Sequence, residues 1–389
     1  MSALADDPNT VKFIYWDNIT YSPPGSREPE EWDGETAAAV YRGYLDHCVE
    51  AERLGYAAVS LPEHFGPSSP MPHPVIMMAA LAARTKTARI LSGVNIPLWH
   101  HPVELAEQLA MIDVLSGGRL EVGLGRYAER AAQDHAVDLI DGILHQVDFP
   151  VAKADLRPMQ AGFLQDAEVA NFNVWPRPVQ RRVPLWSTAG SDSSLEAAAL
   201  RGMNVFTGLN TNPTPDGRMT VTVETMVPRL RRYIEIGQEA GHDLSMANVA
   251  VTCFTAVGDT DHEAAEIVRR GFVSHVQAVA GHTGRLAGTV KPGESSTSSL
   301  ADLENADMRA VLDAPAESYI RNQFALVGSV ETVREKLEAL MSAGLRRFVV
   351  ICGGIGTRHE VGWQTAQRLV EDVAPDLFAA ARQKEPTAA

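Results

Sequence analysis

The sequence has few cysteines and no long apolar run. Only three of its 389 residues are cysteines, Cys48, Cys253 and Cys352, and they lie far apart inside apolar stretches. This distribution is typical of small core residues and disfavours a disulfide framework or a cysteine-rich metal site. No segment approaches the roughly 18 apolar residues of a membrane helix, and residues 1–10 are too polar for a secretory signal. We therefore expect a cytoplasmic protein with no membrane partner.

Basic residues are also scarce. The chain has 34 Lys and Arg residues against 49 Asp and Glu residues, which gives a formal net charge of -15. Its densest basic group is Arg229, Arg231 and Arg232. Because the negative excess repels phosphate backbones, we do not expect nucleic acid as a partner.

Two common cofactor signatures are missing. A metal hydrolase built on a strand–helix barrel would place a His-x-His pair at the end of the first strand, but residues 13–18 read FIYWDN. No Gly-x-Gly-x-x-Gly turn follows that strand either, so a Rossmann domain is not indicated. We expect no metal site, and any nucleotide would have to bind in another way.

What the sequence does contain is an alternation of short apolar runs with helical patterns. Eight runs begin near Val11, Ala57, Arg89, Leu120, Pro184, Asn204, Val249 and Arg347. The second to fourth are spaced by about 30 residues, the length of one strand–helix unit, and such units form parallel sheets. Eight units close a barrel. We predict an α/β protein with a TIM (β/α)8 barrel and insertions, as a single domain over residues 1–389.

Helical stripes and two long intervals complete this picture. Apolar residues at three-and-four spacing predict helices after the first run, from Pro102 and before Gly344, and a final helix over about 364–378 would close the ring. The interval 126–183 holds one loosely placed helix and a proline-rich stretch. The interval 281–303, rich in Gly, Ser and Thr, is either a passive surface insertion or a lid over an active site.

Polar residues follow several of the predicted strands. In such barrels the loops after the carboxyl ends of the strands build the active site. The residues at these positions are Glu63, His64, Asn95, Arg126, Gly190 and Ser191. A neutral imidazole can transfer protons near pH 7, and an arginine at a strand end can bind a phosphate with its planar fork.

Each of these groups also has a purely structural interpretation. Glu63 and His64 could pair with one another or cap the next helix, and Arg126 could form an ion pair with Glu129. His100 and His101 precede a helix start, where capping and packing explain at least one of them.

The segment at 187–202, STAGSDSSLEAAALRG, predicts a strand end and a helix capped by serines. The capping candidates are Ser191, Ser193 and Ser194. Free backbone donors and the helix dipole make such a helix start an anion site. The motif alone is common to N-capped helices, and it gains weight from Arg126 on the preceding strand of the barrel.

Four stretches together resemble the bacterial luciferase-like flavin-dependent monooxygenases. They are AERLGYAAVSLPEHF, ARILSGVNIPLWHHPVELAEQLAMIDVLSGGRLEVGLGR, WPRPVQRRVPLWSTAGS and LVGSVETVREKLEALMSAGLRRFVV. The resemblance implies a barrel that holds reduced FMN at the carboxyl ends of its strands. It also implies activation of O2 as a flavin C4a-hydroperoxide that oxidises a small organic substrate, a separate flavin reductase as partner, and a homodimer.

The resemblance also assigns roles to individual residues. His64 corresponds to the active-site histidine, which would hydrogen-bond the peroxide or relay its proton, and Glu63 would orient the imidazole. Asn95 falls in the segment that lies against the flavin ring. Arg126 corresponds to a residue that reaches the flavin phosphate. The matching phosphate loop contains Gly190, Ser191 and Ser194, and the family's mobile active-site insertion corresponds to residues near 278–318.

The chain departs from the family pattern at two places. Phe65 stands where many members have a second histidine, and residues 125–138 read GRYAERAAQDHAVD in place of a glycine-rich turn. With Trp16 and Trp99, Phe65 could form an apolar wall. The same fold supports hydride transfer with the deazaflavin coenzyme F420 and non-catalytic flavin binding, and both remain alternatives.

Overall fold

The computed structural model describes residues 4–17, 19, 34–64, 69–125, 130–208, 222–271, 317–354 and 357–383. Eight parallel strands pair into a closed ring, which confirms the predicted TIM barrel. In ring order they are β1 (Lys12–Trp16), β2 (Ala58–Leu61), β3 (Arg89–Asn95), β4 (Leu120–Leu124), β7 (Leu185–Thr188), β8 (Asn204–Thr207), β9 (Val249–Val257) and β11 (Arg347–Cys352). β11 pairs again with β1, and each predicted apolar run falls on one of these strands.

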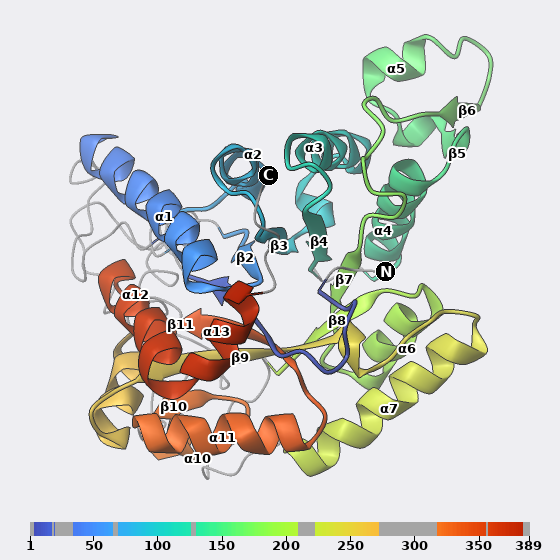
Figure 1. Ribbon diagram of the computed structural model, residues 1–389. Coiled ribbons are helices and arrows are strands. Elements are labelled where there is room, and N and C mark those ends of the chain that lie inside the picture. Colours follow the sequence, from blue (N-terminus) through green and yellow to red (C-terminus); the bar gives the residue numbers. More distant parts are fainter. Residues whose placement is uncertain are drawn as a thin grey trace, which may run out of the picture.

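Helices surround the ring (Figure 1). Those that follow the strands of the first half are α1 (Gly34–Leu54), α2 (Pro74–Arg84), α3 (Pro102–Leu115) and α4 (Arg130–His145). The second half has α6 (Asp192–Leu200), α7 (Val223–Glu239), a helical segment at 261–271, α10 (Glu317–Arg321), α11 (Val330–Ser342) and α12 (His359–Arg368). The predicted stripes face inward, as Leu105, Leu109 and Ile112 on α3 illustrate. None of the described helices combines the length and apolar character needed to cross a membrane.

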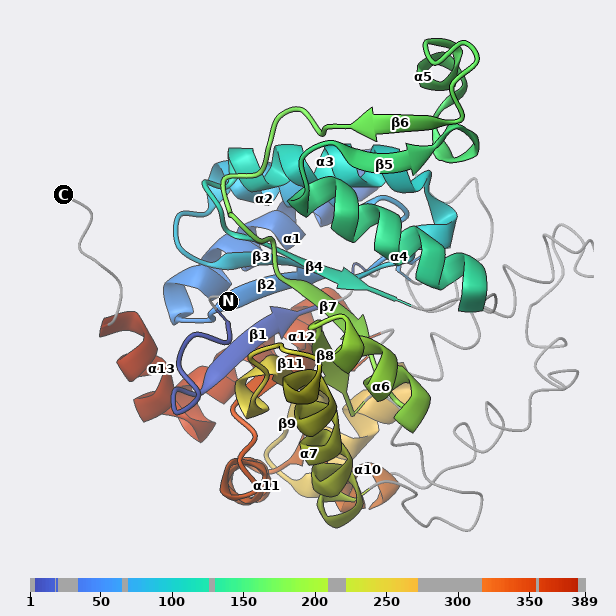
Figure 2. The ribbon, with the colours of Figure 1, turned by 90° about the vertical axis from the view of Figure 1, so that its right-hand side faces the viewer.

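Three strands were not predicted from the sequence. The interval after α4 folds into a hairpin of β5 (Phe149–Ala152) and β6 (Val169–Phe172), with η3 (Lys153–Asp155) and α5 (Pro158–Gly162) between the strands. This hairpin stands away from the barrel (Figure 2). A short strand, β10 (Leu326–Gly328), pairs with β9 outside the ring, and its three residues are too few to show a period.

The expected single helix over 364–378 is wrong. The chain forms α12, then a π-helical turn η6 (Leu369–Val373), then α13 (Pro375–Gln383). Pro375 has no backbone N–H with which to continue a preceding helix, so it begins a new one. The predicted insertion near 278–318 lies almost wholly outside the described residues.

The N-terminal segment crosses the end of the barrel at which the strands begin (Figure 2). Leu4 is buried there, and its N–H donates to Glu121 at 3.3 Å. Glu121 is fully buried and also accepts from Arg89 Nε at 3.0 Å and from Trp186 Nε1 at 2.5 Å. Arg347, equally buried, donates to the carbonyl of Leu4 at 2.7 Å. Buried charges are tolerated when they are paired in this way.

Candidate active site

Two side chains face the interior of the barrel near the carboxyl ends of its first strands. Trp16 belongs to the interior apolar cluster, and its register partner across β1 and β2 is Ser60. Because the strands are parallel, these side chains meet at one end of the barrel.

On β3, Leu91 and Val94 both pack against this interior cluster because the register shifts between Ser92 and Asn95. Asn95 is the register partner of Leu124, which belongs to the helix-facing core, so its side chain lies on the helix side of the barrel wall.

Asn95 has no hydrogen-bond partner for its side chain. The residue is fully buried, yet neither Oδ1 nor Nδ2 is paired, and the buried Oγ of Ser60 is unpaired as well. Leaving a buried polar group unsatisfied costs about 1–3 kcal/mol. Such groups in a native structure point to a missing partner, and for Ser60, which faces the barrel interior, the natural candidate is a bound ligand.

The backbone of β3 comes very close to its neighbour just before Asn95. The register with β4 shifts between Ser92 and Asn95, and Trp16 Nε1 donates to the carbonyl of Gly93 at 3.0 Å. A Cβ atom added to Gly93 would lie 2.0 Å from Ser60 Oγ. A larger residue at position 93 would therefore displace the Ser60 hydroxyl from the inner surface of the site.

His64 lies at the mouth of this interior. Its backbone pairs with Met71 through hydrogen bonds of 3.1 and 3.2 Å, and its Nδ1 is 2.9 Å from Ser69 Oγ. The imidazole meets the edge of Trp16, with ring centroids 6.2 Å apart. Of the other residues predicted for an apolar wall, Trp99 is 38% exposed in η2 (Pro97–Trp99), and Phe65 lies outside the described residues.

Glu63 does not orient His64, which corrects the prediction. Its buried carboxylate lies 2.5 Å from His100 Nε2 and accepts from the backbone N–H of Ile96 at 2.6 Å. The proposed pairing of Glu63 with His64 is therefore wrong, because both oxygens turn toward the segment after β3. Sequence reasoning considered His100 only as a packing or capping residue, and the paired histidines before Pro102 were the signal for it.

The predicted phosphate loop is a capped helix start. Ser191 is the N-cap of α6, and its Oγ accepts from Ser194 N at 3.3 Å. Ser194 Oγ in turn accepts from Ser191 N at 3.0 Å. The serine side chains thus perform the capping role, while the first backbone N–H groups and the dipole of α6 retain the ability to bind an anion.

Two arginines that sequence reasoning did not select lie beside this loop. Arg130, the first residue of α4, donates to Ser193 O at 3.1 Å. Arg229 of α7 donates to Gly190 O at 3.0 Å and pairs with Asp192 at 2.5 Å. Arg126 lies outside the described residues. Two features of the sequence could have pointed to these arginines. Arg130 lies four positions after the predicted phosphate ligand Arg126, and Arg229 belongs to the densest basic group of the sequence.

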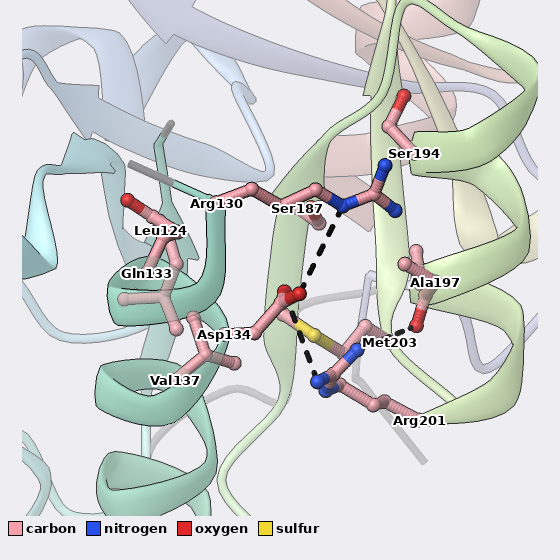
Figure 3. Close-up of a pocket in the computed structure, with 11 residues that line it drawn as sticks. Leu124, Arg130, Gln133, Asp134, Val137, Ser187, Ser194, Ala197, Arg201 and Met203 are labelled. Atoms are coloured by element: carbon pink, nitrogen blue, oxygen red, sulfur yellow. Dashed lines mark hydrogen bonds and ion pairs between the residues drawn. The ribbon is translucent and has the colours of Figure 1, made fainter. Parts of the chain in front are cut away.

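A cavity of about 490 Å³ lies between α4 and α6 (Figure 3). Leu124 and Ser187 line it from the barrel strands and Ser194 from the start of α6. Asp134 bridges Arg130 at 3.9 Å and Arg201 at 3.7 Å across the opening. His64 and Asn95 do not line this cavity, so it belongs to the side of the predicted phosphate loop.

The described residues fit a flat ring with an anionic tail. The ring would meet the unpaired hydroxyl of Ser60 inside the barrel, and the tail would meet the start of α6 beside Arg130. Both lie at the carboxyl ends of parallel strands, so one elongated ligand can reach them. FMN has this shape and charge.

Comparison with known proteins places the chain among flavin-dependent enzymes. The model of the luciferase-like monooxygenase family matches residues 25–347. The alkanal monooxygenase alpha chain of Photobacterium leiognathi is 23% identical over 381 residues, which is 92% of this chain and 97% of that protein. Limonene 1,2-monooxygenase of Rhodococcus erythropolis is 25% identical over 338 residues, 82% of this chain and 77% of that protein.

Two other relatives are matched over part of their length. An uncharacterised protein of Sinorhizobium fredii is 30% identical over 44% of this chain and 52% of its own length. The oxygenase component of flavin-dependent trigonelline monooxygenase from Acinetobacter baylyi is 26% identical over 60% of this chain and 63% of that protein. For these relatives the chain spans between about half and two thirds of the protein.

Solved structures share the fold. A monooxygenase from Streptomyces bottropensis superposes with a TM-score of 0.65 at 22% identity, covering 94% of this chain and 99% of that one. The FMN complex of the oxygenating constituent of 3,6-diketocamphane monooxygenase from Pseudomonas putida gives 0.62 at 20% identity, with the same coverage. An F420-dependent secondary alcohol dehydrogenase gives 0.60 at 15% identity, covering 95% and 99%. At these identities the likeness concerns the fold alone.

Proposed function

We propose that this chain, which belongs to the luciferase-like monooxygenase family, uses reduced FMN and O2 to oxidise a small organic substrate. The observation that carries the proposal is the buried, unpaired hydroxyl of Ser60, which faces the barrel interior at the carboxyl end of β2 beside Trp16. A hydroxyl can donate and accept, which suits the alternating donors and acceptors along the polar edge of a flavin ring.

In this proposal the protein positions the flavin, excludes water from it and provides a proton-transfer group. Reduced FMN, when bound, supplies the electrons with which O2 is activated. Trp16 and the β3 backbone at Gly93 form the inner wall that excludes water. His64, at the mouth, holds or moves a proton at its imidazole. Glu63 positions His100 and does not touch the ring of His64.

The anionic tail would lie at the start of α6. Backbone N–H groups of the first turn and the positive end of the helix dipole attract a phosphate there. Arg130 adds a positive charge within hydrogen-bonding reach of the loop, and Arg229 pairs with Asp192, the acidic residue of the first turn. We propose Arg126, Gly190, Ser191 and Ser194 as further members of this phosphate site.

The experiment is a cofactor titration followed by an oxygen reaction. The purified protein is titrated under anaerobic conditions with photoreduced FMN and, separately, with reduced F420. The FMN complex is then mixed with O2 and a panel of aldehydes, ketones, terpenes and N-heteroaromatic compounds. We expect tight binding of reduced FMN and oxygen uptake matched by loss of one substrate class. Binding of F420 alone, with hydride transfer and no oxygen uptake, would replace this proposal by the deazaflavin alternative.

His64→Ala tests the role of the imidazole in the same assay. We expect product per reduced FMN to fall at least tenfold while H2O2 rises to match, because the proton-transfer group is lost. His135→Gln, on the outer surface of α4, is the matched histidine control and should behave as wild type. Unchanged coupling in His64→Ala would remove this residue from the mechanism. Binding of FMN without any oxygen-dependent product would favour a flavin-binding protein.

We further propose a separate flavin reductase as partner and the cytoplasm as location. The oxygenase component of trigonelline monooxygenase is named as one part of a larger system. A soluble NAD(P)H-dependent reductase would supply reduced FMN by diffusion. Addition of such a reductase with NADH and catalytic FMN should therefore replace photoreduced FMN in the assay.

A homodimer through α2 and α3 completes the proposal. α3 exposes Met111, Val114 and Leu115 at three-and-four spacing, with exposed fractions of 51%, 40% and 59%, and α2 exposes 67% of Ile76. An apolar stripe on neighbouring helices is typical of a protein interface. Light scattering of wild type and Leu115→Lys should give a dimer and a monomer. A monomeric wild type would refute this assignment.

A further inference from the structure

Three side chains that can bind metals converge on one side of the barrel mouth. Glu63 follows β2, His73 precedes α2, and His100 lies between η2 and α3. One potential ligand atom from each lies within 4.8 Å of those of the other two. The His73 and His100 rings have centroids 6.1 Å apart at an interplanar angle of 66°. They therefore approach the carboxylate from different directions.

The spacing is close to that of a real coordination sphere. Ligand atoms of one tetrahedral ion lie about 3.4 Å apart for bonds of about 2.1 Å. A separation of at most 4.8 Å needs only small side-chain rotations to reach this value. Two imidazoles and one carboxylate suit Zn²⁺, Co²⁺ or Ni²⁺ and leave one position open to solvent.

The surroundings support such a role. The second oxygen of Glu63 accepts from Ile96 N at 2.6 Å, and this bond fixes the carboxylate in the way that outer partners orient metal ligands. His73 is the N-cap residue of α2, yet its side chain makes no capping hydrogen bond. The ring is exposed while Glu63 is buried, so a cation from solvent has a path to the carboxylate.

We propose that Glu63, His73 and His100 form a site for one divalent transition-metal ion of the zinc type. Metal binding replaces the Glu63–His100 hydrogen bond by two bonds to the ion and links the start of α2 to the ends of β2 and β3. The site is distinct from the proposed flavin contacts at Ser60 and the α6 loop. It was not expected from the sequence, because its ligands come from three segments without a metal-type spacing.

The test measures metal binding by the untagged, flavin-free protein. Co²⁺ is titrated at pH 7.5, and its visible absorption reports both stoichiometry and coordination geometry. We expect one equivalent to bind and Zn²⁺ to displace it. His73→Gln should weaken Co²⁺ binding at least tenfold, and Glu63→Gln should abolish the visible band.

His135→Gln is the matched control. His135 pairs with Asp155 at 2.9 Å, which makes another histidine–carboxylate pair on the surface. Its loss should leave the titration unchanged. The proposal fails if wild type binds no Co²⁺ at micromolar concentrations, or if His73→Gln binds it as tightly as wild type. Because no flavin or turnover is involved, failure here would leave the proposed oxidation untouched, and failure of that oxidation would leave this site standing.

Discussion

The two ends of the barrel treat buried polar groups in opposite ways. At the end where the strands begin, Glu121, Arg89 and Arg347 are each hydrogen-bonded inside the protein. At the end where the strands finish, Asn95 and Ser60 bury polar atoms that have no partner. Among the described residues with buried unpaired side-chain atoms, three of six lie on β2, β3 or the segment after β3, the third being His101.

This difference separates buried polar groups that stabilise the fold from buried polar groups that bind a ligand. A buried charge with all its partners inside the protein stabilises one arrangement of the chain. A buried polar group without partners destabilises the free protein, and one that faces a binding site is retained where a ligand completes it. The same barrel therefore holds a closed polar network at one end and an incomplete one at the other.

Breaking the closed network should have the largest effect. Glu121→Ala removes the acceptor of Arg89 Nε and of the Trp186 N–H, and it leaves the largely buried Arg89 guanidinium without its carboxylate partner. We expect unfolding free energy to fall by about 3–5 kcal/mol. Urea denaturation followed by circular dichroism measures it. Glu104→Ala, on an exposed part of α3, is the control and should change stability by no more than about 0.5 kcal/mol. A small loss in Glu121→Ala would remove the contrast between the two ends.

Substitution at the incomplete end should have the opposite sign. Ser60→Ala removes the unpaired hydroxyl and leaves an apolar side chain in its place. We expect the flavin-free protein to gain about 1 kcal/mol, because no buried donor or acceptor is left unsatisfied at this position. Affinity for reduced FMN should fall at least tenfold, about 1.4 kcal/mol. Thermal unfolding without flavin and an anaerobic titration provide the two measurements. A destabilised variant with normal FMN affinity would make Ser60 structural.

A third cluster, between α1 and α12, sharpens the comparison. His47 stacks on Trp363, with ring centroids 4.4 Å apart, and its ring centroid lies 4.2 Å from that of His359 at a tilt of 33°. Both histidines have an unpaired ring nitrogen. Burial and the neighbouring His359 lower the pKa of His47 to about 4. Burial opposes protonation of His359 too, but its hydrogen bond to Asp17, 2.6 Å long, outweighs this and raises its pKa.

These directions predict a pH-dependent stability. The unfolded chain binds a proton at His47 near pH 6.5, whereas the folded chain resists it down to about pH 4, so stability falls as pH falls through this window. His359 contributes stability below pH 6.5 and loses it as pH rises through its raised pKa. Between pH 7 and pH 5 we expect a loss of about 1 kcal/mol from half-buried His47.

Urea unfolding at the two pH values measures this loss. His47→Gln should reduce the difference between pH 7 and pH 5, whereas His135→Gln, an exposed histidine, should keep it. If both variants lose as much unfolding free energy between pH 7 and pH 5 as wild type, the unpaired nitrogens between α1 and α12 do not destabilise the fold. Unpaired atoms alone would then be a poor guide to function, and the argument for Ser60 would rest on its position inside the barrel beside Trp16.

The sequence predicts the barrel better than the contacts within its site. All eight ring strands follow from apolar runs, because a strand buried on both faces leaves a local signature. The hairpin of β5 and β6 leaves none, since its strands have four residues each and are half exposed. The direction in which Glu63 turns depends on Ile96 and His100, and adjacency to His64 in sequence gave the wrong partner. Arg130 and Arg229 reach the α6 loop through helix packing, which residue spacing does not encode.

Pairing of β1 with β11 has a consequence for biosynthesis. β1 is synthesised early, whereas its ring neighbour β11 begins only at Arg347. One edge of β1 therefore stays unpaired for most of translation. Leu4 finds its place only after that closure, because Arg347 holds its carbonyl. We therefore expect an affinity tag fused directly before residue 4 to hinder this late docking of the N-terminal segment, whereas a tag after residue 383 would not hinder it.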